Sequence, residues 1–147
     1  SNQVNACDST SNVFKLTGVQ LEIGETATPF EFRSFADELR LCQRYYEKSY
    51  ATGTAPGTAT QHGCAYIPVI STSEVPGQRF KVEKRAAPTM TIYSPVDGAS
   101  GYVYSNGSDR VASSVGYVET SGFGFISSSS AALTTPTQYH WVVDAEL

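Results

Sequence analysis

The sequence predicts a mainly β protein with one short helix, in which the strands form an antiparallel sandwich. Charged residues make up 16% of the 147 residues and hydrophobic residues 40%. This charged share lies below the roughly 25% of an ordinary soluble domain, and it favours a turn-rich β protein. Short alternating apolar runs separated by turn dipeptides fill the chain after residue 50. A segment before them, residues 34–49, lacks β-branched residues, Gly and Pro, as a helix requires.

The first part of the chain, residues 1–33, is predicted to be an extended arm. Apolar residues alternate with polar ones on both sides of Gly18, and the parity of the alternation switches there. A bulge at Gly18 would place both apolar sets on one face. We therefore expect one bulged strand over residues 13–23. Its edge must pair with an upstream part, a neighbouring copy or the C-terminal sheet, because an isolated strand is not stable.

Residues 34–49 are the clearest single element and predict a helix. Ser34 is a candidate N-cap with Asp37 three residues later, and bases follow the early acids. Spacings of four, three and four place one stripe on a single helix face: Phe35, Leu39, Cys42 and Tyr46. Two interpretations stay open, since the stripe could pack on its own domain or meet its copies at a threefold axis.

The remaining residues, 50–147, are predicted to form a jelly-roll-like antiparallel sandwich, with residues 51–60 as a flexible or extended connection. Turn signals occur at Pro76-Gly77, at Asp97-Gly98, at Asn106-Gly107 and in the serine run 127–130. The expected strands are residues 64–70, 79–84, 89–93, 101–104, 111–119, 122–127 and 139–147. Seven short strands at this spacing are typical of a sandwich.

Several function classes are excluded by the residues themselves. A net charge of −4 offers no basic face for nucleic acid, and no apolar run is long enough to cross a membrane. The two histidines, His62 and His140, accompany no nucleophile-elbow motif, so no catalytic residue is predicted. The three cysteines are Cys7, Cys42 and Cys64, and their odd number leaves at least one thiol free or paired between chains. We expect reduced thiols in a protein that folds in a cytoplasm, and the cysteine spacing predicts no metal site. No cofactor is expected.

Aromatic residues give the one positive indication of a ligand. Aromatic rings stack on the apolar faces of sugars, while neighbouring polar groups fix the orientation of the sugar. Tyr102 and Tyr104 share one parity between two turns, and Asp97, Asn106 and Asp109 flank them. These five residues are the candidate ligand-binding surface. The alternative is that the tyrosines pack inside the sheet or at a subunit interface.

The last aromatic residue along the chain, Trp141, has a different pattern. Trp141 shares parity with apolar Val143 and Leu147 on the last predicted strand. This pattern predicts a core residue or an anchor at a trimer interface.

Eight short sequence motifs occur in a fixed order along the chain, four of them in its first third and four later. The first four are residues 16–24 (LTGVQLEIG), 27–31 (ATPFE), 38–39 (EL) and 42–46 (CQRYY). The later ones are residues 80–82 (FKV), 85–89 (RAAPT), 139–141 (YHW) and 144–147 (DAEL). The series resembles the C-terminal domain of bacteriophage tail fibre and tailspike proteins. One departure is Lys84-Arg85, where that family commonly has Met-Arg.

The resemblance implies a homotrimeric attachment domain on the virion. Residues 1–33 would end an upstream jelly-roll-like module, residues 34–49 would be the helix, and residues 50–147 would form the C-terminal β domain. The protein would be made in the host cytoplasm and become extracellular after release. Its expected partner is a bacterial surface polysaccharide or another host receptor. Two alternatives remain: a trimerisation or capping module without a ligand, and a fragment of a polysaccharide-degrading tailspike.

Overall fold

The computed structural model describes residues 16–26, 28–69, 71, 73–129, 132–133 and 136–146. The chain divides into two compact units, Ser1–Ser34 and Phe35–Leu147. Several sequence-based expectations fall partly or wholly outside the described residues. They concern Cys7, residues 1–15 of the predicted arm, Ile70, Ser130 of the serine run and Leu147.

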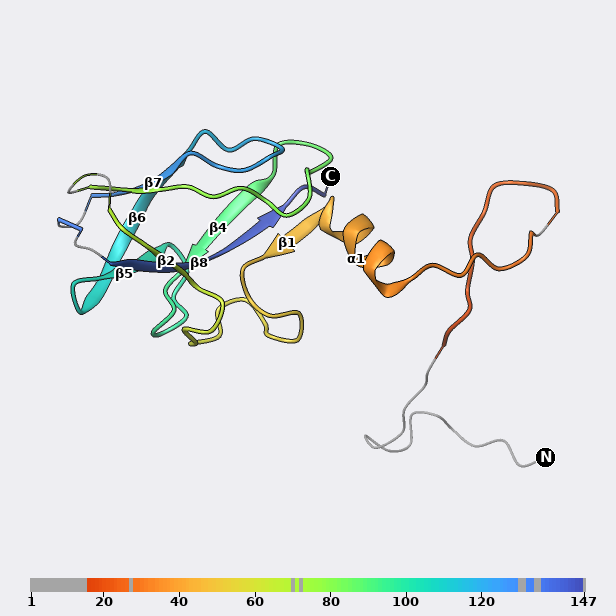
Figure 1. Cartoon of the computed structure of the whole chain (residues 1–147), viewed down its shortest axis with the longest axis horizontal. Helices are drawn as coiled ribbons and strands as arrows, with labels where there is room; N and C mark the ends of the chain where they lie inside the picture. Colours follow the sequence, from red (N-terminus) through yellow and green to blue (C-terminus); the bar gives the residue numbers. More distant parts are fainter. Residues whose placement is uncertain are drawn as a thin grey trace, which may run out of the picture. The chain divides into compact units, whose positions relative to one another are not determined.

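The C-terminal unit contains one short helix and eight strands among the described residues (Figure 1). Helix α1 spans Phe35–Gln43. The strands are β1 (Tyr46–Lys48), β2 (Ala65–Ile67), β3 (Glu74–Pro76), β4 (Thr89–Tyr93), β5 (Tyr102–Ser105), β6 (Ser108–Gly116), β7 (Phe125–Ser128) and β8 (Thr137–Asp144). All strand pairs are antiparallel. The prediction of a mainly β, antiparallel fold with one short helix is confirmed.

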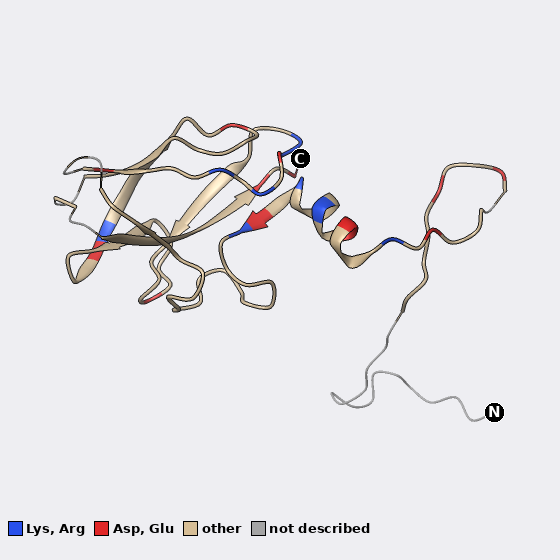
Figure 2. Cartoon of the chain, viewed as in Figure 1, with Lys and Arg blue, Asp and Glu red and all other residues tan. Residues whose placement is uncertain are grey.

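Strand β8 organises the sheet, because four other strands pair with it. β1 and β4 pair with its C-terminal half, whereas β2 and β5 pair with its N-terminal half. The sheet then continues from β5 through β6 and β7 to β3. Figure 2 shows that charged residues occupy only a small part of this ribbon, in agreement with the low charged fraction.

The sheet curls so that β3 and the segment after it face β8. The Tyr139 hydroxyl donates to the Pro76 carbonyl over 3.2 Å, and Trp141 Nε1 donates to Gln78 Oε1 over 2.9 Å. The Trp141 ring also lies 5.6 Å from the Phe80 ring. Trp141 is only 4% exposed, so its assignment to a trimer interface is wrong. Its ring packs in the core of its own chain.

The predicted helix is too long at its C-terminal end. α1 ends at Gln43, and a turn leads directly into β1. Tyr46, Glu47 and Lys48 pair with β8, which lies almost a hundred residues later in the chain. Pairing with a distant strand overrides a helix preference worth only tenths of a kcal/mol per residue.

Most predicted strands are present, but residues 79–84 do not form one. This segment has an isolated bridge between Arg79 and Gly122 and otherwise no ladder. The backbone N–H groups of Lys81 and Val82 donate instead to the Glu47 carboxylate, over 3.0 and 3.4 Å. A side chain therefore replaces the strand partner that the alternating pattern predicted.

The predicted arm strand is also absent from its described part. Residues 16–23 carry no strand assignment, although Gly18 adopts a φ of 71°, the left-handed region that favours glycine. Residues 16–26 form a ladder with none of the described strands. Its alternating pattern therefore has another cause, which becomes clear from the side chains of the arm.

The loop between β1 and β2 is packed against β8 and is not a free connection. The Tyr50 ring stacks on the His140 ring at 3.8 Å, with an interplanar angle of 12°. His140 Nε2–H donates to the Thr60 carbonyl over 2.9 Å, and Nδ1 lies 2.8 Å from the Ser49 hydroxyl. His140 is fully buried, and this burial lowers its pKa below the usual value of 6.5.

Candidate functional site

Four side chains form one row across neighbouring strands on the outer face of the sheet. Tyr66 of β2 is paired with Gln138 of β8, Gln138 with Tyr104 of β5, and Tyr104 with Asp109 of β6. Directly paired residues lie on the same face of a sheet, with Cβ atoms about 5 Å apart. We call these four residues the tyrosine row. Figure 1 shows β5 and β6 at the end of the C-terminal unit away from α1, and β8 running from there across the unit towards β1.

The outer position of the row follows from the alternation of burial along β5. Val103 and Ser105 are fully buried, so Tyr102 and Tyr104 project from the opposite face. Tyr66 is 67% exposed and Tyr102 is 37% exposed. Because these rings face solvent on strands of a hydrogen-bonded sheet, they can offer flat apolar surfaces to a ligand.

Two carboxyl groups meet at the β6 end of the row. Asp97 and Asp109 share a hydrogen bond, and the Ser94 hydroxyl donates to Asp109 over 2.5 Å. The Ala99 N–H donates to Asp97 over 2.8 Å and lowers the pKa of that carboxyl. Burial raises the pKa of Asp109, and the nearby charge of Asp97 raises it further. The pair therefore offers both hydrogen-bond acceptors and a carboxyl that retains its proton more readily.

The β5–β6 hairpin ends in the turn that the Asn-Gly dipeptide predicts. Asn106 and Gly107 both have positive φ, 52° and 73°, as a type I′ turn requires. Asn106 is exposed at the tip, next to the strands that carry Tyr104 and Asp109. The structure thus places all five predicted ligand-binding residues around one hairpin and the preceding turn.

Sequence reasoning missed two members of the row, Tyr66 and Gln138. Each lies in a predicted strand or directly beside one, but nothing local connects either residue with Tyr104. Only the register between β2, β8 and β5 brings them together.

A second surface surrounds the predicted interface stripe. Leu39, Cys42 and Tyr46 line a cleft of about 270 Å³, together with Lys48 and Lys81. The fourth stripe residue, Phe35, is 75% exposed, and no residue of α1 is buried. The stripe is therefore available to a partner, whereas Trp141, the other residue predicted for the interface, belongs to the core.

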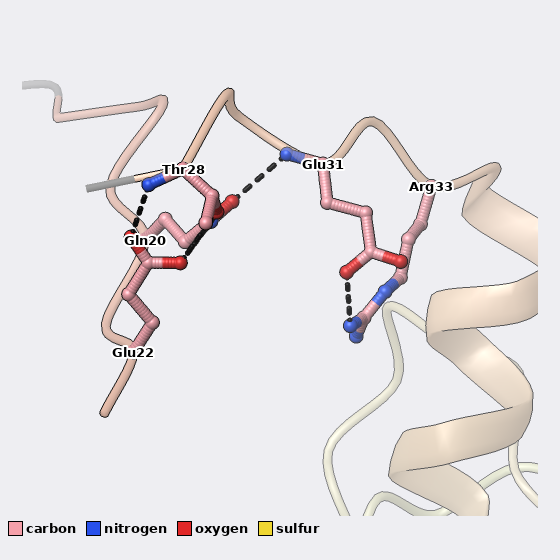
Figure 3. Close-up of polar contacts among 5 residues, drawn as sticks. All are labelled: Gln20, Glu22, Thr28, Glu31 and Arg33. Carbon is pink, nitrogen blue, oxygen red and sulfur yellow. Dashed lines mark hydrogen bonds and ion pairs between the residues drawn. The ribbon is translucent and has the colours of Figure 1, made fainter. Parts of the chain in front are cut away.

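The arm contains a network of polar side chains that we call the arm clasp, made by Gln20, Glu22, Thr28 and Glu31 (Figure 3). The Glu22 carboxylate accepts from the Thr28 N–H over 2.6 Å and from the Thr28 hydroxyl over 2.5 Å. Gln20 donates to Glu22 over 3.1 Å and accepts from the Glu31 N–H over 2.8 Å. The hydrogen bonds that Glu22 accepts lower its pKa, and the bond from the Thr28 hydroxyl contributes most.

Within the described residues, no group of three or more His, Cys, Asp or Glu side chains could hold a metal ion. The described part of the chain also contains no helix with the length and hydropathy needed to cross a bilayer. No protein-family model, no curated protein and no solved structure matches this chain. The resemblance to phage tail proteins therefore stays a prediction from the sequence.

Proposed function

We propose that this chain is a distal domain of a bacteriophage tail fibre or tailspike, which recognises a bacterial surface glycan as a homotrimer. The observation that carries the proposal is the tyrosine row, which places one exposed ring, one half-buried ring, an amide and a carboxyl group on one surface, with Asp97 beside that carboxyl group. The sequence resemblance supplies the phage context, and the binding surface supplies the chemistry.

The proposed contact uses the two kinds of groups that a sugar presents. The rings of Tyr66 and Tyr104 stack on the apolar faces of two sugar residues. Gln138 lies between these rings in the row and can exchange hydrogen bonds with sugar hydroxyls. Asp97 and Asp109 accept hydrogen bonds at the end of the row. The polar groups fix the orientation, while the rings provide most of the buried area.

The proposed trimer is supported by apolar surface that one chain leaves uncovered. α1 buries none of its residues, and a nine-residue helix is marginal in water unless other groups pack on it. A cyclic trimer would cover such surfaces without leaving an open end. Light scattering behind a sizing column tests this directly, because three chains of 15.8 kDa give about 47 kDa.

Substitution of the row tests the glycan proposal. We expect Tyr104→Ala and Tyr66→Ala each to weaken binding of a host surface polysaccharide about tenfold, which corresponds to about 1.4 kcal/mol. Tyr117→Ala is the matched control, since Tyr117 is 80% exposed beyond the other end of β6. Binding and phage adsorption are measured on variants that keep the wild-type melting temperature.

The alternatives predict other outcomes. A trimerisation or capping module without a ligand predicts normal adsorption by all three variants, and that result would remove the binding proposal. A fragment of a polysaccharide-degrading tailspike predicts that the chain alone shortens capsule polysaccharide. We expect no such shortening, because glycosidases hold two carboxyl groups about 5 Å or more apart around the scissile bond, whereas Asp97 and Asp109 are joined by a hydrogen bond.

A further inference from the structure

The cleft beside α1 takes no part in the proposed glycan contact. α1 leads directly into β1 (Figure 1), and both elements line the cleft together with the loop after β1 and the irregular segment that Glu47 holds. β1 pairs with the C-terminal half of β8, whereas the tyrosine row crosses its N-terminal half. The cleft volume of about 270 Å³ lies just below the range of about 300–1,000 Å³ for drug-sized ligands. It therefore suits a ligand with one ring.

Three side chains of the lining are aliphatic or aromatic, namely Leu39, Tyr46 and Tyr50. Tyr50 is fixed, because its ring stacks on His140 at 3.8 Å and its hydroxyl accepts from the Gly57 N–H over 3.2 Å. Tyr46 is held by the ladder between β1 and β8. The cleft is therefore largely preformed and offers apolar surface to the flat face of a ligand.

The charged part of the lining is cationic. Lys48 and Lys81 both line the cleft. Neither ammonium group forms an ion pair with a carboxylate in the part of the chain that the structure describes. The carboxylate in the lining, that of Glu47, is almost fully buried and already bonds to the Lys84 ammonium group and to two backbone N–H groups. The cleft thus has two cations and no available anion of its own.

Lys48 is oriented by its neighbours and keeps one donor for a ligand. Its Nζ donates to the Thr52 carbonyl over 3.1 Å and to the Thr54 carbonyl over 2.5 Å. An ammonium group has three N–H donors, so these two bonds leave one donor, and carbonyl groups do not neutralise the charge. Lys48 is half-buried. An anion beside a half-buried cation is attracted more strongly than beside a fully exposed one, because water screens the pair less.

We propose that this cleft binds a small organic carboxylate that carries one ring. The carboxylate pairs with the ammonium groups of Lys48 and Lys81 through charge-assisted hydrogen bonds. The ring lies against Leu39, Tyr46 and Tyr50, as their apolar surface in the lining allows. This chemistry has two sources, an acidic sugar residue of a glycan and a free aromatic acid, and the probes below distinguish them.

The site goes beyond the proposed glycan contact and does not depend on it. The lining includes no residue of the tyrosine row. On α1, Phe35 and Leu41 lie outside the lining and are 75% and 42% exposed. These two residues stay available to a trimer contact while the cleft is occupied. Loss of binding in the cleft therefore leaves the row and the trimer untouched, and the reverse holds as well.

A chemical-shift titration of the ¹⁵N-labelled full chain at low salt tests the site with three probes. Methyl β-glucuronide represents an acidic sugar, benzoate represents a free aromatic acid, and methyl β-glucoside has the sugar ring without the carboxylate. We expect a Kd on the order of 1 mM for at least one carboxylate, with shifts at the amides of α1 and β1. The glucoside should bind at least tenfold more weakly than the glucuronide. Absence of binding by both carboxylates would overturn the proposal.

Two charge variants separate the cleft from the overall charge of the chain. Lys81→Met should weaken carboxylate binding about fivefold, the size expected for one partly exposed ion pair. Arg40→Met is the matched control, because Arg40 is an exposed cation of α1 that lies outside the lining. It should leave the Kd unchanged. Equal weakening by both variants would overturn the proposal, since binding would then follow net charge alone.

The Cys42 thiol locates the ligand, because Cys42 lines the cleft and is exposed. Its thiolate displaces iodide from iodoacetamide and forms a thioether, at a rate that mass spectrometry follows. We expect a saturating concentration of the bound carboxylate to slow this reaction at least threefold at Cys42. Cys64 lies outside the lining and should react at an unchanged rate. An unchanged rate at Cys42 would overturn the assignment of the ligand to this cleft.

Discussion

Lys84→Met removes the cation from a buried ion pair that anchors an irregular segment to β1. Lys84 Nζ lies 2.7 Å from Glu47 Oε2, and both side chains are almost fully buried. The ammonium group also donates to the Val82 carbonyl and lies 4.9 Å from the centre of the Phe80 ring. Methionine has a similar length but no charge and no hydrogen-bond donor, so the substitution leaves a buried carboxylate without its cation.

The expected loss is about 3 kcal/mol of unfolding free energy. Removing one partner of a buried pair typically costs roughly 3–5 kcal/mol. The lower end applies here, because Glu47 keeps the N–H groups of Lys81 and Val82 as donors. For a domain of this size, 1 kcal/mol corresponds to about 4 °C in Tm, so Tm should fall by about 12 °C.

Urea unfolding at pH 7, followed by the fluorescence of the single tryptophan, measures this loss. Lys81→Met is the control, because Lys81 lies in the same segment but is exposed, and its cost should stay within about 0.5 kcal/mol. Glu47→Gln combined with Lys84→Met removes both charges and keeps an acceptor for the two N–H groups. This double variant should therefore be more stable than Lys84→Met alone. A loss below about 1 kcal/mol for Lys84→Met would refute the reasoning.

Three further predictions concern the fold. Because burial lowers the pKa of His140 below 6.5, the unfolded chain binds its proton first. Stability should then fall as pH decreases below about 6.5, and an NMR titration of the His140 ring should have its midpoint below that value. Gly101→Ala places a Cβ in open space at a φ of 81°, and we expect thermal unfolding to show a loss of about 1–2 kcal/mol. Gly98→Ala has a similar φ but puts its Cβ 1.9 Å from the Gly57 carbonyl oxygen, so calorimetry should show a loss at least about 2 kcal/mol larger.

The features that the sequence predicted well depend on local chemistry. Residues 89–93 were predicted as a strand and form β4 with the same bounds, because Pro88 precedes this segment and the Asp97-Gly98 turn follows it. Asn106-Gly107 forms the predicted tight turn, since this dipeptide accepts positive φ at both positions. The start of α1 also agrees with its predicted cap to within one residue.

The features that the sequence did not predict depend on distant partners. The end of α1 at Gln43 follows from the pairing of β1 with β8, and no local signal reports that pairing. The same holds for the candidate site. Tyr102 and Tyr104 could be chosen from one short segment, whereas Tyr66 and Gln138 join the row only through the sheet register.

The arm shows how a correct pattern can lead to a wrong element. Alternation over residues 19–23 predicted a strand, yet the polar parity is explained by the arm clasp, which joins Gln20 and Glu22 to residues 28–31. Alternation reports that an extended segment has two different faces, and it does not identify the partner of either face. Here the polar face finds its partner within the arm, while Leu21 and Ile23 remain in water. Burying those two side chains is worth about 1.5–3 kcal/mol each, so the pattern that failed to predict a sheet records an apolar face that the arm itself leaves uncovered.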